Sequence, residues 1–166
     1  MLGPAIAVLS IAGCSGSAGD RAGAAATPSA AAGLGERGAT PAKSPTQKVT
    51  KEITASYDFW APSRNIGCYV GSDVARCDIV SKSWKPPAPP DDCELDFGGG
   101  VSVSQREEGT LTCAGDTVLG ADETLHYGEA VKVGDFTCDS ESAGVRCENT
   151  ATGHGFTLSR EKYTLF

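Results

Sequence analysis

Few side chains in this sequence are suited to catalysis, and His154 is the most suggestive of them. It stands between Gly153 and Gly155. Flanking glycines let a backbone approach a ligand closely, and an imidazole can act as a base near neutral pH. Ser159 and Asp116 could complete a nucleophilic triad with it. The Gly-x-Ser-x-Gly elbow of many serine hydrolases is absent, however, so we assign no catalytic residue.

Four residues are candidates for ligand binding instead: His154, Asp116, Tyr127 and Arg160. Two of them also have a plain structural interpretation. His154 could donate a hydrogen bond to a turn carbonyl, and Asp116 lies in Gly115-Asp116-Thr117, a sequence typical of turns. The sequence leaves both interpretations open.

The acidic run around Cys93 offers oxygen ligands of the kind that calcium binds. It consists of Asp91, Asp92, Glu94 and Asp96, and no glycine stands where a calcium-binding loop requires one. We therefore expect a solvated acidic face. The cysteines lack any Cys-x-x-Cys spacing, which argues against zinc, and we expect neither a metal nor a cofactor.

Six cysteines outside the N-terminal segment are suited to form disulfides: Cys68, Cys77, Cys93, Cys113, Cys138 and Cys147. Six cysteines allow fifteen pairings. An internal similarity favours one of them. Ile66-Gly67-Cys68, eight residues and Cys77-Asp78 match Phe136-Thr137-Cys138, eight residues and Cys147-Glu148. Because cysteines across a β-hairpin can face one another, we predict Cys68–Cys77 and Cys138–Cys147, which leaves Cys93–Cys113.

Short segments in which apolar and polar residues alternate predict the strands that position these groups. Glycines and aspartates separate them at intervals typical of small sandwiches and barrels. The clearest segments are 101–104, 110–113, 130–133 and 156–159. We predict an all-β domain, a small disulfide-stapled sandwich or barrel with two related Cys-x8-Cys hairpins.

Two short segments differ from this pattern. Trp84 precedes four prolines within residues 86–90, and we expect a rigid edge connection with Trp84 packed on the core. A docking strip for a partner is the alternative. Residues 159–162 could form one helical turn with Ser159 as its cap.

The N-terminal segment has the features of a bacterial export signal. An apolar run over residues 5–12 leads into Ile11-Ala12-Gly13-Cys14, which resembles a lipobox. We predict a lipoprotein signal peptide over residues 1–13 and lipidation of Cys14, which would anchor the protein to the outer face of the cell membrane. Because no positive charge follows Met1 before the apolar run, we also expect the true start codon to lie upstream.

Composition separates the rest of the chain into a tether and a head. Residues 14–52 are rich in Ala, Gly, Ser, Thr and Pro and carry a net charge of +2, which predicts a disordered tether. Residues 53–166 hold nine basic and eighteen acidic residues and should form the disulfide-stapled β domain. Such an acidic head argues against nucleic-acid binding, which needs clustered Lys and Arg.

Ordered motifs throughout the head carry a family resemblance. They are Phe59, Pro62-Ser63, Asn65-Ile66-x-Cys68, Arg76-Cys77-Asp78-Ile79, Trp84-x-Pro86-Pro87, Cys113-Ala114-Gly115-Asp116-Thr117, Tyr127-Gly128, Gly144-Val145-x-Cys147, Thr152-Gly153-His154-Gly155-Phe156, Leu158-Ser159-Arg160 and Tyr163-x-Leu165-Phe166. Over about residues 55–166 the chain resembles a family of exported actinobacterial proteins and lipoproteins known only as a domain of unknown function. The resemblance implies an envelope location and paired cysteines. The chain departs from the family pattern at Arg64 and His126, where Gly and Pro are expected.

These observations lead to one expected function and two alternatives. We expect a noncatalytic binding module of the cell envelope, anchored to the bilayer through Cys14, with an envelope protein or glycan as its partner. The first alternative is a small envelope hydrolase or transferase that uses His154. The second is a secreted protease inhibitor, whose exposed loop would be Gly71-Ser72-Asp73 beside a disulfide.

Overall fold

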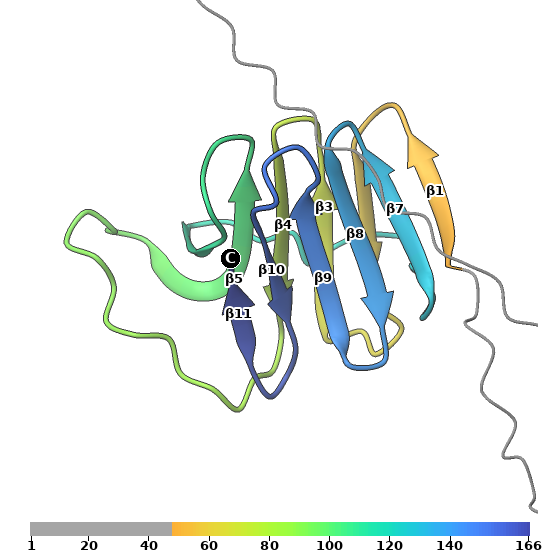
Figure 1. Ribbon diagram of the computed structural model, residues 1–166. Coiled ribbons are helices and arrows are strands. Elements are labelled where there is room, and N and C mark those ends of the chain that lie inside the picture. Colours follow the sequence, from red (N-terminus) through yellow and green to blue (C-terminus); the bar gives the residue numbers. More distant parts are fainter. Residues whose placement is uncertain (1–47) are drawn as a thin grey trace, which may run out of the picture. The chain divides into compact units, whose positions relative to one another are not determined.

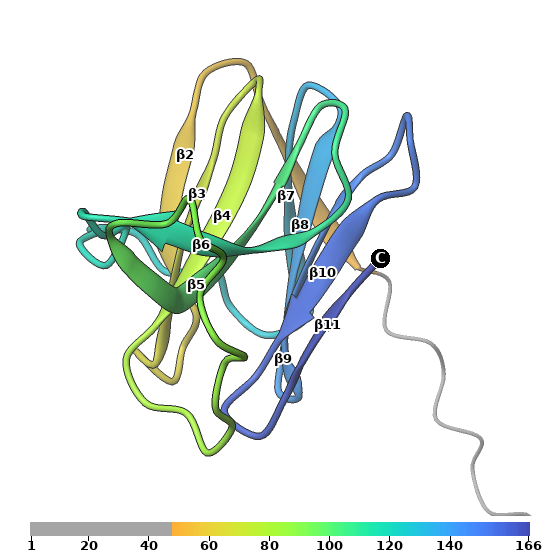
Figure 2. The ribbon, with the colours of Figure 1, turned by 90° about the vertical axis from the view of Figure 1, so that its left-hand side faces the viewer.

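The computed structural model of the chain describes residues 48–166, which form eleven β-strands in two sheets (Figures 1 and 2). These residues contain no helix, and the two sheets face each other across one shared hydrophobic core. The domain is therefore an all-β sandwich, as the alternating sequence pattern predicts. The strands are β1 (Val49–Ile53), β2 (Tyr57–Trp60), β3 (Ile66–Val70), β4 (Val74–Ile79), β5 (Asp96–Ser104), β6 (Thr110–Ala114), β7 (Glu129–Val133), β8 (Phe136–Glu141), β9 (Gly144–Asn149), β10 (Gly155–Leu158) and β11 (Tyr163–Leu165).

Each sheet contains an antiparallel meander of five consecutive strands. Strands β2 to β6 form the first sheet, and β7 to β11 form most of the second, in which β1 adds in parallel beside β7. The register places Cys68 opposite Cys77 in the first sheet and Cys138 opposite Cys147 in the second. The internal similarity of the sequence is thus a structural repeat, with one meander from each half of the domain.

The first strand begins inside the range predicted for the tether. Residues 49–52 belong to β1, so the β domain starts four residues before the predicted boundary at residue 53. The strand is hard to detect because its single partner is the edge of β7, and three of its five residues stay exposed. Lys51 Nζ lies 3.4 Å from Glu129 Oε2 on β7 and supports the pairing. The predicted signal peptide, Cys14 and the tether up to residue 47 lie outside the described residues.

Two disulfides form the centre of the core. Cys68–Cys77 crosslinks β3 and β4, and Cys138–Cys147 crosslinks β8 and β9, with Cα atoms 4.1 Å apart in each pair. All four residues are fully buried. The Sγ atoms of Cys77 and Cys147 lie 3.8 Å apart, so the bridges of the two facing sheets touch. The repeated hairpin therefore supplies both the crosslinks and much of the packing between the sheets.

We call residues 80–95 the arm, the long connection between β4 and β5 on the left of Figure 1. Its Trp84 packs on the core, with 4.6 Å between the ring centroids of Trp84 and Tyr163, and Trp84 Nε1 donates to Ser159 O at 3.0 Å. The third disulfide, Cys93–Cys113, ties the end of the arm to β6. Trp84 and the prolines thus form the predicted edge connection.

All three disulfides match the pairing expected from the sequence. Disulfides persist in oxidising compartments, so their presence indicates a location outside the cytosol. Residues 48–166 contain no helix that is long and apolar enough to span a membrane.

The helical turn expected at residues 159–162 does not form. These residues make a tight bend between β10 and β11, in which Ser159 N donates to Lys162 O at 2.9 Å. Ser159 Oγ accepts hydrogen bonds from the amides of Glu161 at 3.2 Å and Lys162 at 3.1 Å. Ser159 therefore caps a turn, as its side chain suggests. The chain then reverses into β11, whose Tyr163 and Leu165 pack against the core.

Gly98 on β5 has a backbone conformation that other residues could adopt only with strain. Its φ is 75°, and a Cβ placed on it would lie 2.5 Å from the Cβ of Pro86 in the arm. Gly98→Ala is expected to lower the free energy of unfolding by about 1–3 kcal/mol, because the left-handed conformation and the steric conflict both penalise alanine. Gly99→Ala is the matched control, since nothing lies within 4 Å of a Cβ there. In urea denaturation, the midpoint of Gly98→Ala should lie below that of the wild type, whereas the midpoint of Gly99→Ala should not. Equal midpoints for the two variants would contradict this account.

Arg64 is the single non-glycine residue with a positive φ in residues 48–166, at 56°. The family resemblance leads one to expect glycine there, which adopts this conformation freely. The Arg64 guanidinium lies 5.0 Å from the centroid of the Trp60 ring, a cation–π contact that offsets part of the conformational cost.

Candidate functional site

Turns from both sheets meet at the lower end of the sandwich in Figure 1 and enclose a cleft of about 380 Å³, which we call the end cleft. The β8–β9 turn and the β10–β11 turn come from the second sheet, and the β2–β3 loop comes from the first. The residues that line the end cleft are Ala61, Ser63, Asn65, Ile66, Tyr127, Glu141, Ser142, Ala143, Gly144, Ser159, Arg160 and Glu161. The cleft thus exists because the two meanders pack face to face with these turns at the same end.

The structure brings together two of the four predicted ligand-binding residues. Tyr127 and Arg160 both line the end cleft, from segments that are 33 positions apart in the sequence. Asp116 lies on the outer face of the first sheet, and His154 lies in the β9–β10 turn. The predicted group is therefore split among three places.

Several polar side chains of the end cleft have no partner within residues 48–166. The side chains of Tyr127, Ser142, Arg160 and Glu161 make no hydrogen bond or ion pair there, and Tyr127 is 47% exposed. Within the same range, the Glu141 carboxylate makes one ion pair, with 3.7 Å between its Oε1 and Lys48 Nζ. These groups can bond to a ligand without first breaking contacts with the described part of the chain.

Other polar side chains of the cleft hold its rim in place. Asn65 Nδ2 donates to Ser81 O at 2.9 Å, and Asn65 Oδ1 accepts from Ser81 N at 2.9 Å. The capped turn at Ser159 fixes Arg160, whose carbonyl accepts from Ser83 N at 2.8 Å. The rim is thus bonded to the start of the arm.

Glu141, Ser142 and Glu161 line the cleft but were not predicted from the sequence as site residues. Each lies in or beside a tight turn of the second sheet, where a polar residue is expected whether or not it binds anything. Glu141 and Ser142 lie between Cys138 and Cys147 of the predicted hairpin, but their place beside Arg160 depends on the packing of β8–β9 against β10–β11. No local pattern in the sequence could have assigned them.

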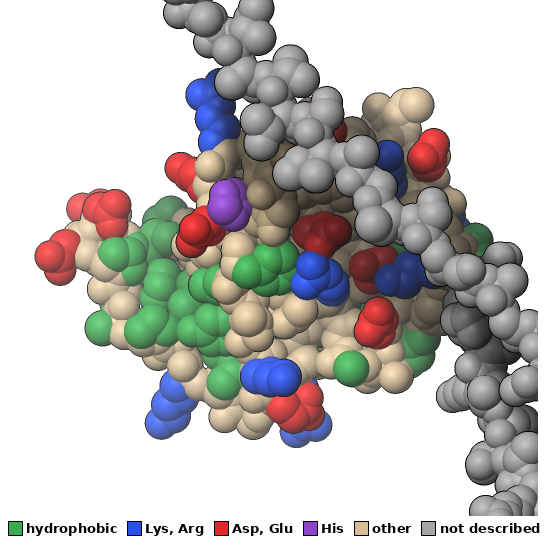
Figure 3. Space-filling model, in the orientation of Figure 1, with side chains coloured by type: hydrophobic (Ala, Val, Ile, Leu, Met, Phe, Trp, Pro, Cys, Tyr) green, Lys and Arg blue, Asp and Glu red, His purple; other side chains and the backbone are tan. Residues whose placement is uncertain are grey.

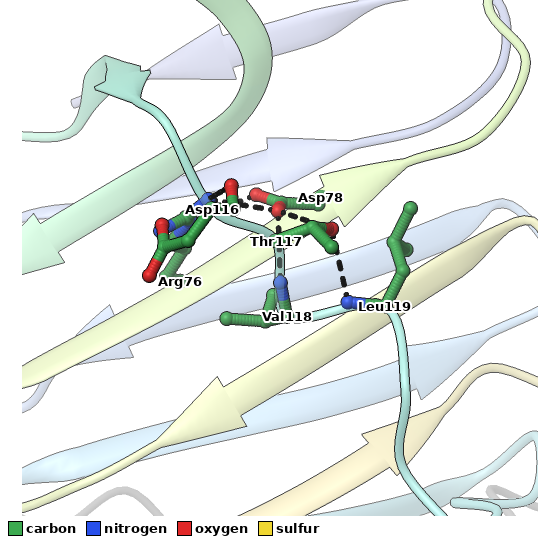
Figure 4. A network of polar contacts seen from close by, with 6 residues as sticks. All are labelled: Arg76, Asp78, Asp116, Thr117, Val118 and Leu119. Atoms are coloured by element: carbon green, nitrogen blue, oxygen red, sulfur yellow. Dashed lines mark hydrogen bonds and ion pairs between the residues drawn. The ribbon is translucent and has the colours of Figure 1, made fainter.

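Asp116 belongs to a polar network on the outer face of the first sheet (Figure 4). Arg76 donates to both carboxylate oxygens of Asp78 at 2.9 Å and to Asp116 Oδ1 at 2.8 Å. Asp78 Oδ2 also accepts from Thr117 Oγ1 and Val118 N, each at 3.0 Å. Asp78 is only 4% exposed. This Asp78 network clamps the segment after β6 onto β4, so we assign Asp116 a structural role.

The hydrogen bond from Arg76, together with the charge of its guanidinium, lowers the pKa of the Asp116 carboxyl below its ordinary value. Burial alone would lower the pKa of Arg76, but its hydrogen bonds and ion pairs with Asp78 and Asp116 more than offset this and raise it. Because the folded pKa of Asp116 is depressed, its stabilising effect is complete above its unfolded pKa of about 3.9 and is lost as the pH falls through the lower folded value.

The urea midpoint of the wild type should therefore fall more steeply between about pH 5 and pH 2 than that of Asp116→Asn, which has no carboxylate to protonate. Parallel denaturation curves at several pH values test this. Identical pH profiles would show that Asp116 does not contribute to stability through its charge.

His154 does not assemble the triad that its chemistry suggested. Strand β10 separates His154 from Ser159, and five residue steps along a strand span roughly 16 Å. Ser159 Oγ is also committed to its turn, where it donates to Lys162 O at 3.0 Å. Within residues 48–166 the main chain of His154 shapes its turn, since its carbonyl accepts from Asn149 N at 2.8 Å. The imidazole does not make the predicted bond to a turn carbonyl there.

The loop proposed for protease inhibition is a tight hairpin turn. Gly71 N donates to Val74 O at 2.9 Å, and Gln105 Nε2 donates to Ser72 O at 2.9 Å. Residues 71–73 are therefore folded back on themselves and bonded to the β5–β6 connection.

Hydrophobic side chains gather on one side of the molecule, over the arm and the neighbouring strands β5 and β11 (Figure 3). Trp84, Phe97, Tyr163 and Leu165 are partly buried against the core here, whereas Leu95 is 59% exposed. The four acidic residues of the run around Cys93 are all exposed, as expected for a solvated acidic face. No group of three His, Cys, Asp or Glu side chains suited to a metal ion occurs in the described part of the chain. The arm therefore extends the core over one side of the sandwich, and its acidic side chains face the solvent.

Comparison with known protein families gives a match over the whole β domain. A family model described as "Family of unknown function (DUF6636)" matches residues 48–166. This range begins one residue before β1 and covers every strand of both sheets. No curated protein and no solved structure matches the chain.

Proposed function

Since the chain belongs to the DUF6636 family, a family of unknown function, we propose that it is a noncatalytic binding module of an actinobacterial cell envelope. The ligand binds in the end cleft, at turns that the two core disulfides hold on a rigid frame. The observation that carries this proposal is the set of polar side chains in the cleft that have no partner within residues 48–166: Tyr127, Ser142, Arg160 and Glu161. Binding sites typically place a few such groups on loops above a rigid scaffold.

The proposal includes a lipid anchor on Cys14 that keeps this module at the outer face of the membrane. Its support is the order Ile11-Ala12-Gly13-Cys14 after an apolar run, followed by a segment with little to bury. A Cys14→Ala variant expressed in the native bacterium should leave the membrane fraction. Unchanged fractionation would argue against the anchor and leave the end cleft to be tested separately.

Binding by the end cleft can be tested with insoluble envelope material from the bacterium that produces the protein. The full chain should sediment with this material, and Tyr127→Ala and Arg160→Ala should each weaken binding about tenfold or more, because buried aromatic and arginine contacts commonly dominate binding energy. His126→Ala and Arg106→Ala are matched controls, since both residues are exposed and neither lines the cleft. Equal binding by all four variants would overturn the assignment of the cleft.

His154→Ala separates this proposal from an enzymatic role. We expect it to bind envelope material as the wild type does and to unfold at a similar urea concentration. Release of soluble products from the envelope by the wild type, lost in His154→Ala without loss of stability, would favour the hydrolase or transferase instead.

A further inference from the structure

We infer that the end cleft takes a neutral saccharide, an uncharged segment of an envelope glycan bound through vicinal hydroxyl groups. This inference rests on the proposed function and names the chemical class of its ligand.

The charges of the end cleft argue against a strongly charged ligand. Arg160 supplies one positive charge, and Glu141 and Glu161 supply two negative charges. Lys48 Nζ lies 3.7 Å from Glu141 but 2.8 Å from Asp139, so it does not cancel the charge of Glu141. The cleft therefore holds charges of both signs, with a small net negative charge. A phosphate or sulfate group would meet two carboxylates and the field of a head that is strongly acidic overall. A multivalent cation would meet the Arg160 guanidinium.

The same groups suit the hydroxyl pairs of a sugar. A carboxylate accepts through two oxygens and a guanidinium donates through several N–H groups in one plane, so each can bond two neighbouring hydroxyls at once. Ser142 adds a hydroxyl that both donates and accepts. Opposite charges on Arg160 and Glu161 let the cleft offer donors and acceptors to a ligand that carries no charge of its own.

Tyr127 supplies the apolar contact that such a ligand needs. Tyr127 lines the cleft and is 47% exposed, so its aromatic ring and phenolic hydroxyl have surface that a ligand can contact. Aromatic side chains with one apolar body and one polar tip suit ligands that have both kinds of surface. The C–H face of a pyranose ring and its outward hydroxyls form such a ligand.

The shape of the site favours more than one sugar ring. A second hollow of about 210 Å³ shares Glu141, Ala143, Gly144 and Ser159 with the end cleft. The two hollows thus adjoin across the rim formed by the β8–β9 turn and the end of β10. A short saccharide chain can occupy the end cleft and continue into the second hollow.

The test uses the envelope-binding assay with selective damage to the envelope before mixing. Periodate, which cleaves the carbon–carbon bond between vicinal hydroxyls, should reduce binding of the full chain about tenfold or more after the reagent has been quenched. Protease digestion of the envelope should leave binding unchanged. Raising the salt concentration from about 50 to 500 mM should change the affinity less than about twofold, because no net charge is paired on binding.

Variants locate the effect in the end cleft. Tyr127→Phe keeps the ring and should stay within about threefold of the wild type, whereas Tyr127→Ala should lose about tenfold. Binding that survives periodate and is lost after protease treatment would overturn the saccharide inference while leaving the proposed function standing. Binding that spermidine or inorganic phosphate displaces at low salt would also overturn it. Absence of any envelope binding by the wild type would instead contradict the proposed function itself.

Discussion

A variant with alanine in place of Cys68, Cys77, Cys138 and Cys147 is expected to be unfolded at 25 °C. Each core disulfide closes a loop of about 10 residues, and loop-closure entropy assigns about 2.7 kcal/mol to each. The four buried sulfur atoms also fill the centre of the sandwich, so their removal leaves a cavity that adds to the loss. The total reaches the net stability of a typical domain, about 5–15 kcal/mol, at its lower end.

Near-ultraviolet circular dichroism and urea titration test this expectation. The variant should lack both the aromatic signal of the wild type and a cooperative urea transition. Cys93→Ala/Cys113→Ala is the control, because Cys113 is exposed and its bridge lies outside the core. It should keep a cooperative transition, with a free energy of unfolding lower by about 3 kcal/mol for its loop of about 21 residues. A cooperative transition in the four-alanine variant would show that packing holds the sandwich without its central bridges.

The contact between the two core bridges has a further measurable consequence. The Sγ atoms of Cys77 and Cys147 lie 3.8 Å apart, so removal of one bridge should loosen the surroundings of the other. Destabilisation in Cys68→Ala/Cys77→Ala and in Cys138→Ala/Cys147→Ala should therefore not add independently, as is usual for residues in contact.

Asp78→Ala should lower the free energy of unfolding by about 3–5 kcal/mol, the cost typical of breaking a buried ion pair. The Asp78 carboxylate accepts from Arg76, Thr117 and Val118, and its loss leaves the partly buried Arg76 guanidinium without its bidentate partner. The segment after β6 would then lose its attachment to β4. Urea denaturation measures the loss, and hydrogen exchange at Val118 and Leu119 should show the segment released.

Two further variants separate the buried pair from ordinary surface charge. Asp78→Asn keeps the shape and part of the hydrogen bonding and should cost less than alanine. Asp58→Ala removes an exposed carboxylate on β2 and should leave the urea midpoint near that of the wild type. A loss in Asp78→Ala no larger than in Asp58→Ala would contradict the clamping role of the network.

The features that the sequence predicted well are local ones. The cysteines of each core bridge are nine positions apart, and a two-strand hairpin with direct cross-strand pairing places them face to face. The packing of Trp84 follows from a large apolar ring next to prolines that cannot continue a strand. In both cases the residues that decide the outcome lie close together in the chain.

The features that the sequence missed or left open depend on distant partners. Strand β1 exists because β7 offers it an edge about 80 positions later in the chain. Asp116 is held by Arg76, which is 40 positions away. His154 and Ser159 are close in sequence, yet the intervening strand β10 places them at its two ends. Propensity and turn chemistry carry no information on such pairings.

The amino-acid sequence by itself determined the all-β character, the two Cys-x8-Cys hairpins and the pairing of all six cysteines, because alternation and hairpin register act over a few residues. Only the tertiary structure decided that Tyr127 and Arg160 share one cleft with Glu141, Ser142 and Glu161, while Asp116 and His154 lie elsewhere. The physical reason is that the cleft is formed by turns of two sheets, and the packing of their buried faces sets which turns meet at the same end of the sandwich.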